Sequence, residues 1–265
     1  MTKQTQYSHH YTLTAGESDA EGRMPLTLVT ERVIEVATEH ANALGIGYDT
    51  LIKENIGWVL SRLSIEMLRY PVINDRYTLS TWIESYNRHF SERNFVMTDC
   101  AGNVLGHMRT VWVAMDFASR SVADITKLER VPFPIPDVPC PIAKTPRIPK
   151  LPPEAECESY TFRYRDLDFN RHVNTVRYLD LILNHWSLEH FDRMVPARFD
   201  VMFHHECHYG ETVELRVAEG PQTCPGSICE IALHDGTRAV AARIFWRQED
   251  MPTASSCSIC RGNGG

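Results

Sequence analysis

The chain has 265 residues, which is enough for one large domain or two modest ones with an ample core. Its hydrophobic content of 43% and charged content of 23% are typical of a globular protein. No apolar run approaches the roughly 18–20 residues that a membrane-spanning helix needs, so we expect no membrane span. The net charge of −7 argues against general affinity for nucleic acid.

Cysteine content and the N-terminus point to a reducing compartment. The first ten residues lack the apolar core of a signal peptide, and eight cysteines in such a chain indicate free thiols rather than a disulfide framework. Cys257 and Cys260 have the spacing of half a zinc site, but no second pair accompanies them. We therefore expect a cytoplasmic protein without a metal, ending in a disordered tail over residues 251–265.

The first half reads as one helix followed by strands. Apolar residues recur at helical spacing from Val29 to His40, and Gly45 provides a helix end. Stretches rich in β-branched and aromatic residues then predict strands at 58–70, 77–86, 93–98 and 104–116. A helix followed by strands joined through short turns favours an α+β fold over alternating βαβ units.

A proline-rich stretch divides the chain. Nine of the 23 residues from 131 to 153 are proline, so this stretch cannot form a helix or an interior strand. We predict an extended linker at 131–153 between an N-terminal unit, 1–130, and a C-terminal unit, 154–250. The second unit repeats the order of the first, with a helix at 175–190 and strands at 199–209, 212–218, 228–233 and 239–246.

Three polar residues precede the second helix. Asp168, Asn170 and His172 occupy alternate positions, so in an extended segment their side chains would share one face. With Asn174 as N-cap, these groups would converge near the free N–H groups of a helix N-terminus. That arrangement suits a reaction in which an oxyanion develops, such as acyl transfer. The competing interpretation is that the segment only forms turns and caps and that its histidine is structural.

A second polar cluster lies in the predicted strand 199–209. Glu206 is a candidate general base and Cys207 a candidate nucleophile, and neighbours on a regular strand face opposite ways. Only one of them can therefore point at His172 unless a bulge intervenes. We assign Glu206 to the site and keep Cys207 as the alternative nucleophile, because cysteine is common as a small buried hydrophobe. His204 and His208 would share a strand face, but no third ligand is evident, so we predict no metal site.

These clusters resemble the signature of the acyl-acyl-carrier-protein thioesterases. The segment Arg165-Asp-Leu-Asp-Phe-Asn-Arg-His-Val-Asn-Thr-Val-Arg-Tyr-Leu-Asp180 is similar to the family's S-D-L-D-M-N-Q-H-V-N-N-V-K-Y. Glu206 follows His172 by 34 residues, as the family's R-E-C tripeptide follows its histidine. Similar strings occur in the family's order at Trp58-Val-Leu-Ser-Arg-Leu, Arg69-Tyr-Pro71, Thr81-Trp82 and Val111-Trp-Val-Ala-Met115. The chain departs from the family pattern at Phe169, Arg171, Thr175 and His205.

The resemblance implies a tandem double hotdog fold of the α+β class, with one helix wrapped by an antiparallel sheet in each unit. It also implies hydrolysis of fatty acyl thioesters carried by acyl carrier protein (ACP), with no cofactor. Glu206 would activate water, His172 would share or relay the proton, Asn170 would position the carbonyl, and Asp168 would orient the network.

The partner implied by the resemblance is ACP, which is acidic, so docking needs a local basic patch. The candidates are Arg88, Arg93, Lys144, Arg147, Lys150 and Arg171. Two other functions stay open at this stage: hydrolysis of coenzyme A thioesters by the same site, and a non-catalytic acyl-binding hotdog module. Chain-length preference and dimerisation are also open.

A comparison of the two halves predicts a single active site. The helix patterns pair Asp19 with Asp166, which sets three further pairs: Pro25 with His172, Arg23 with Asn170, and Glu21 with Asp168. The following turns pair Tyr70 with Glu206. The first half therefore lacks the catalytic set, and we expect it to supply acyl-chain-binding surface.

Overall fold

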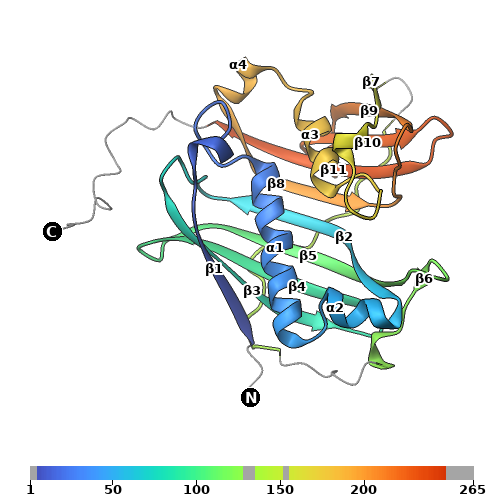
Figure 1. Ribbon diagram of the computed structural model, residues 1–265. Helices are drawn as coiled ribbons and strands as arrows, with labels where there is room; N and C mark the ends of the chain where they lie inside the picture. Colours follow the sequence, from blue (N-terminus) through green and yellow to red (C-terminus); the bar gives the residue numbers. More distant parts are fainter. Residues whose placement is uncertain (1–4, 128–134, 152–154, 249–265) are drawn as a thin grey trace.

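The computed structural model describes residues 5–127, 135–151 and 155–248 (Figure 1). The helices are α1 (Leu26–Leu44), α2 (Tyr48–Leu51), α3 (Thr175–Leu183) and α4 (Leu188–Phe191). The first-half strands are β1 (Gln6–Thr12), β2 (Ile56–Met67), β3 (Arg76–Tyr86), β4 (Phe90–Asp99), β5 (Val104–Asp116) and β6 (Ser121–Val122). The second-half strands are β7 (Glu156–Thr161), β8 (Met194–Phe203), β9 (Thr212–Glu219), β10 (Ser227–Leu233) and β11 (Arg238–Gln248). Single 3-10 turns occur at Ala15–Glu17, Ile52–Glu54, Ile125–Lys127 and Tyr164–Asp166.

All of these strands belong to one antiparallel sheet. Its order is β1-β3-β4-β5-β2-β8-β11-β10-β9-β7, with β6 paired to β5. The two halves of this order mirror each other, so each half is a five-stranded sheet of the same topology. They join where β2 pairs with β8, over residues 62–66 and 198–202. This agrees with the expected tandem double hotdog of the α+β class, and it shows that the two units pair edge to edge.

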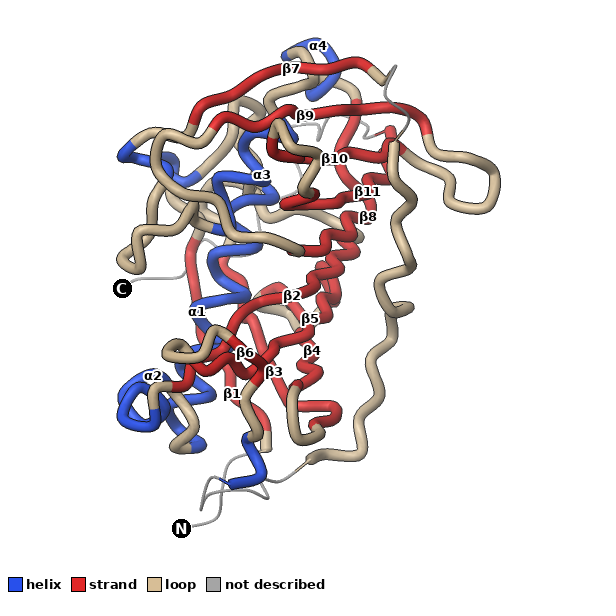
Figure 2. Tube along the Cα trace, turned by 90° about the vertical axis from the view of Figure 1, so that its right-hand side faces the viewer, coloured by secondary structure: helices blue, strands red, loops and turns tan. Residues whose placement is uncertain are grey.

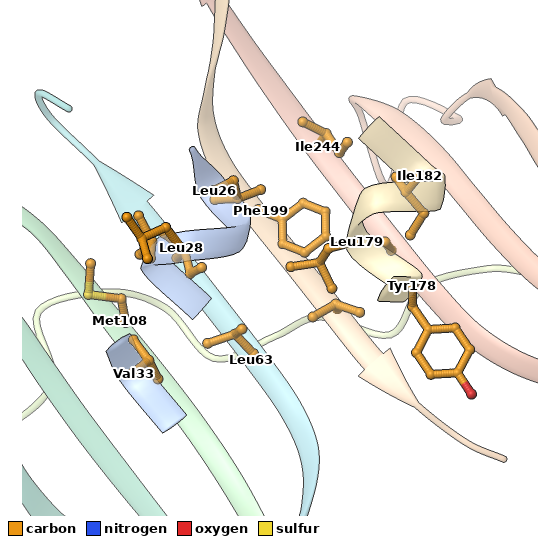
Figure 3. Close-up of a cluster of buried hydrophobic side chains, with 14 of the residues drawn as sticks. Leu26, Leu28, Val33, Leu63, Met108, Tyr178, Leu179, Ile182, Phe199 and Ile244 are labelled. Carbon is orange, nitrogen blue, oxygen red and sulfur yellow. The ribbon is translucent and has the colours of Figure 1, made fainter. Parts of the chain in front are cut away.

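The helices cover one face of the sheet, where the main core lies. Alternation along the central strands puts Leu63 and Ile65 of β2 on this face beside Phe199 and Val201 of β8, all fully or almost fully buried. Figure 3 shows Phe199 between Leu26 of α1 and the α3 side chains, so one continuous core runs across the junction. The two halves therefore share a core rather than packing as separate bodies.

The opposite face of the junction is polar. Asp200 is fully buried, accepts a hydrogen bond from Ser64 (Oγ–Oδ1 2.6 Å) and lies between the guanidinium groups of Arg198 and Arg243. Arg198 also pairs with Glu66 of β2. Each buried charge at the junction thus has an opposite charge beside it, as burial requires.

The segment 135–151, here called the strap, runs along this polar face (Figure 2). Its backbone carbonyls accept hydrogen bonds from strands of both halves: Trp82 and Arg109 donate in the first half, Arg198 and Arg238 in the second. The predicted extended connection is present in these residues. It lies flat on the sheet and is bonded to it.

Several boundaries differ from the sequence predictions. The predicted helix 175–190 stops at Leu183, because Asn184 and Ser187 take cap positions and α4 follows as a separate turn. The predicted strand 199–209 ends at Phe203, so Glu206 and Cys207 lie in the loop beyond it. The edge strands β1 and β7 were not predicted. Helix α1 ends at Gly45 with a left-handed backbone (φ 75°), as expected. The predicted tail 251–265, with Cys257 and Cys260, lies outside the described residues.

No helix in the described part of the chain is long and apolar enough to cross a bilayer.

Candidate active site

A tight turn, not an extended segment, holds Asp168, Asn170 and His172. Asp168 Oδ1 accepts hydrogen bonds from the backbone N–H groups of Asn170 (2.8 Å) and His172 (3.2 Å). The Arg171 backbone N–H donates to the Asp168 carbonyl, and Arg171 has a left-handed backbone (φ 66°). The prediction that these three side chains alternate along a strand was therefore wrong, because the aspartate bonds the following backbone and bends it.

This turn is fastened to the start of α3 and to the loop after β8. Asn174 is the N-cap of α3, as predicted, and its side chain accepts from the Val176 backbone N–H at 3.1 Å. The Val173 N–H donates to the Cys207 carbonyl, and His172 and His208 form a backbone bridge. These backbone bonds bring the predicted residues of the two clusters together at the N-terminus of α3.

Glu206 lies between two cationic or potentially cationic groups. Its Oε1 is 3.6 Å from His172 Nδ1, and its Oε2 is 2.5 Å from Nη2 of Arg120. The His172–Glu206 separation is longer than a hydrogen bond but within ion-pair range, and catalytic bonds often tighten only when substrate is present. Arg120 comes from the first half, and the sequence analysis missed it. An exposed arginine just beyond a predicted strand gives no sequence signal that it reaches the second half.

Asn170 lies in the same turn, two residues before His172. Its side chain is exposed, and its position is set by the Asp168 turn rather than by a bond to the His172 ring. Phe169 is also exposed and makes an edge-on ring contact with Tyr48 of α2, at 5.8 Å between centroids. This contact places the turn of the second half against the α2 region of the first.

Cys207 is fully buried. Its backbone N–H donates to the Tyr178 hydroxyl (3.0 Å), and its carbonyl accepts a hydrogen bond from the Val173 backbone N–H. Burial raises the pKa of the Cys207 thiol, which keeps it protonated and weakly nucleophilic at neutral pH. Burial likewise raises the pKa of Tyr178, so its hydroxyl stays neutral. Cys207 thus has the environment of a packing residue, while its neighbour Glu206 is partly exposed at the site.

The histidines around Glu206 form no metal centre among the described residues. No group of three or more metal-ligating side chains occurs in this part of the chain. His204 and His205 are exposed, and His208 packs edge-on against the His172 ring, with 5.0 Å between centroids.

The same turn occurs ahead of α1, and it corrects the predicted pairing of the two halves. Asp19 Oδ1 accepts from the backbone N–H groups of Glu21 (3.1 Å) and Arg23 (2.7 Å), just as Asp168 does in the second half. Arg23 and Val72 form an isolated backbone bridge in the first half, and His172 and His208 form the corresponding bridge in the second half.

The equivalent positions are therefore Asp19 with Asp168, Glu21 with Asn170, Arg23 with His172, and Pro25 with Asn174 as N-caps. The predicted pairs were two residues out of register, because the helix pattern alone does not fix the length of the preceding turn.

The position of Tyr70 agrees with the prediction. In the first half the Met24 N–H donates to the Pro71 carbonyl, and in the second half the Val173 N–H donates to the Cys207 carbonyl. Pro71 is therefore equivalent to Cys207, and the residue before it, Tyr70, is equivalent to Glu206. Tyr70 is buried and donates to the Pro196 carbonyl at 2.8 Å. A cavity of about 250 Å³ opens here, lined by Arg23, Tyr70, the start of α1, the end of α3 and α4. The first-half turn thus keeps the aspartate and lacks the imidazole, the carboxamide and the carboxylate of Glu206.

The predicted basic docking residues do not form one surface. Arg93 is buried (4% exposed) and donates to His40 Nδ1 at 2.6 Å, so it cannot contact a partner protein. Arg88 pairs with Asp124, and Lys144 pairs with Glu92. The strap, which carries Lys144, Arg147 and Lys150, lies on the sheet face opposite α3 (Figure 2). Of the predicted set, Arg171 is the residue in the turn that forms the site.

Known proteins resemble the chain over nearly its whole length. Residues 4–130 match the acyl-ACP thioesterase N-terminal domain, and residues 150–248 match the C-terminal domain. A crystal structure of an acyl-ACP thioesterase from Bacteroides thetaiotaomicron VPI-5482 is 27% identical, with a TM-score of 0.85, covering 92% of this chain and 98% of that one.

Two chloroplast proteins are also similar. The oleoyl-acyl carrier protein thioesterase 2 of Arabidopsis thaliana is 28% identical over 205 residues, covering 71% of this chain and 56% of that protein. An acyl-[acyl-carrier-protein] hydrolase of Cuphea viscosissima is 24% identical over 261 residues, covering 92% of this chain and 63% of that protein. The chain thus spans less than two thirds of the length of these curated relatives.

Proposed function

Because the chain belongs to the acyl-ACP thioesterase family and has its double hotdog fold, we propose that it hydrolyses fatty acyl-ACP to a free fatty acid and the carrier protein. One observation carries this proposal. Glu206 and His172 face each other at 3.6 Å near the N-terminus of α3, next to the turn that contains Asn170, whereas the equivalent first-half positions hold Tyr70, Arg23 and Glu21. A carboxylate and an imidazole at this separation can together remove a proton from water.

The reaction proceeds by attack of water on the thioester carbonyl. Glu206 accepts a proton from water, directly or through His172, as the water oxygen bonds to the carbonyl carbon. The resulting tetrahedral oxyanion collapses, the carbon–sulfur bond breaks, and the departing thiolate takes up a proton. The products are the fatty acid and the carrier thiol, and no metal or cofactor enters this balance.

Stabilisation of the oxyanion falls to Asn170 and the first turn of α3. The exposed Asn170 carboxamide has N–H donors two residues before His172, and the helix N-terminus carries a partial positive charge. Removal of one such donor commonly costs about 100- to 1000-fold in rate. Asp168 acts on the backbone of this turn, so its contribution is to hold Asn170 and His172 in place.

The first half supplies the acyl-binding wall in this proposal. A small cavity of about 40 Å³ lies between α1 and the sheet, lined by Ala37, Ala41, Trp58 and Trp112 among others. These side chains are apolar over most of their surface, which suits an alkyl chain. The ring contact between Tyr48 and Phe169 places this half against the catalytic turn.

A hydrolysis panel tests the proposal. Purified protein is given acyl-ACP thioesters of graded chain length beside the matching coenzyme A thioesters, with and without a chelator. We expect chelator-resistant release of fatty acid, faster from the carrier. Preference for coenzyme A would favour the alternative acyl-CoA activity, and binding without turnover would favour an acyl-binding module. The cytoplasmic location and the oligomeric state stay predictions.

A further inference from the structure

A hairpin of the first half reaches the catalytic residues of the second. Strand β5 ends at Asp116, and a turn leads to β6, which pairs back on β5. Arg120 precedes β6, and its Nη2 lies 2.5 Å from Glu206 Oε2. A charge-assisted bond of this length fixes the carboxylate more firmly than a neutral hydrogen bond does.

The turn that presents Arg120 is built to hold one conformation. Asp116 Oδ1 accepts from the backbone N–H groups of Ala118 and Ser119, both at 2.9 Å, and the Ser119 and Ser121 hydroxyls bond each other. The hydrogen bond from Ser119, with that from Ala118, lowers the pKa of Asp116, so this carboxylate stays ionised.

Arg120 itself has a left-handed backbone (φ 51°). Among described non-glycine residues, the others with this conformation are Asn55, Asn74 and Arg171. Asparagine adopts it readily, whereas arginine does so at a cost. The two arginines both lie at the candidate site, and strained backbone of this kind is typically retained where it serves function.

We infer that Arg120 is a positioning residue for the reaction: it holds Glu206 Oε2 so that Oε1 faces His172 and the attacking water. This rests on the proposed function of Glu206 as the base. The active site is then assembled from both halves, since the base comes from the second and the group that orients it from the first.

The electrostatic surroundings of Glu206 give this role a measurable consequence. The charged or titratable groups that the described residues place against it are Arg120 from the hairpin, His172 from the turn and Tyr178 from α3. Tyr178 is neutral, so Arg120 is the permanent positive charge in this set. Its removal takes away both the bond to Oε2 and the positive charge beside the carboxylate, so Oε1 is no longer held toward His172 and kcat should fall.

Arg120→Ala and Arg120→Lys test the inference, with Arg88→Ala as matched control. Arg88 has the same exposure as Arg120 (64% and 65%) and pairs with Asp124 instead of Glu206. We expect Arg120→Ala to lower kcat about tenfold, which corresponds to about 1.4 kcal/mol of activation free energy, with little change in KM. Lysine should restore most of the rate, because it keeps the charge, and Arg88→Ala should behave as wild type.

Several outcomes would overturn the inference while leaving the proposed function intact. These are wild-type kcat in folded Arg120→Ala, or a rise in KM alone, which would make Arg120 a carrier-docking residue. An equal loss in Arg88→Ala would point to general surface charge. A wild-type protein that hydrolyses no acyl thioester in the panel would refute the proposed function, and the Arg120 role with it.

Discussion

Replacement of Cys207 by alanine should leave the protein folded and active, whereas Glu206→Gln should abolish most turnover. The thiol is fully buried, and its pKa is raised from an ordinary 9.0 by that burial. Even at the ordinary value, only about one thiol in a hundred is ionised at pH 7, and burial reduces that fraction further. A nucleophile in that state is poorly prepared for attack.

The two substitutions differ in expected size. Loss of one buried sulfur should cost about 1 kcal/mol of unfolding free energy, and the backbone bonds of residue 207 to Tyr178 and Val173 remain in the variant. Glu206→Gln keeps the shape but cannot accept a proton. General-base catalysis contributes about 10²–10⁴ in rate, or roughly 2.7–5.5 kcal/mol of activation free energy.

Single-turnover hydrolysis of an acyl-ACP thioester measures both variants without interference from product release. Thermal melts of each variant confirm that it is folded. An alkylating reagent does not discriminate between the hypotheses, because bulk added beside the site blocks substrate in either case. An inactive Cys207→Ala beside an active Glu206→Gln would refute the assignment of Glu206 and establish the thiol as nucleophile.

Other substitutions separate chemistry from architecture. His172→Ala should lower the hydrolytic rate about 100-fold or more, and near-wild-type turnover in the folded variant would contradict its role. Asp168→Ala and Asp19→Ala each remove two side-chain-to-backbone bonds, so denaturant melts should show similar losses of about 1–2 kcal/mol, while only Asp168→Ala impairs hydrolysis. Tyr70→Phe should cost about 1 kcal/mol without affecting hydrolysis; a lost rate would show that the first half takes part in the chemistry. Asp200→Ala should destabilise by about 3–5 kcal/mol, since it leaves the buried Arg243 guanidinium without its carboxylate and Arg198 with Glu66 as its remaining carboxylate; an unchanged melt would disprove that electrostatic account of the junction.

Periodicity and caps in the sequence predicted the helices and the long strands well. Asn174 was expected as the N-cap of α3 because a polar residue preceded an apolar helical pattern, and it has that role. Gly45 ends α1 for an equally local reason. The edge strands β1 and β7 were missed because neither has a buried residue among those whose burial is described, so their apolar signal is weak.

The candidate site was harder to predict in its geometry than in its residues. Asp168 was expected to orient a side-chain network, but its oxygen bonds backbone N–H groups, and the same bonds recur at Asp19. Alternation along a strand is a regular pattern that sequence can show, whereas an aspartate turn departs from it. Arg120 lies 86 residues before Glu206, and only the paired sheets bring the two together.

The strap has a consequence for how the two halves could diverge. In a symmetric pair of identical chains, every substitution appears at both equivalent sites, so neither site can lose its chemistry while the other keeps it. Here one covalent connection, bonded to strands of both halves, joins two units of the same topology that differ in sequence. Arg23 and Tyr70 could replace an imidazole and a carboxylate in one copy because His172 and Glu206 persist in the other. The continuous chain thereby lets two halves of one topology carry different residues at equivalent positions.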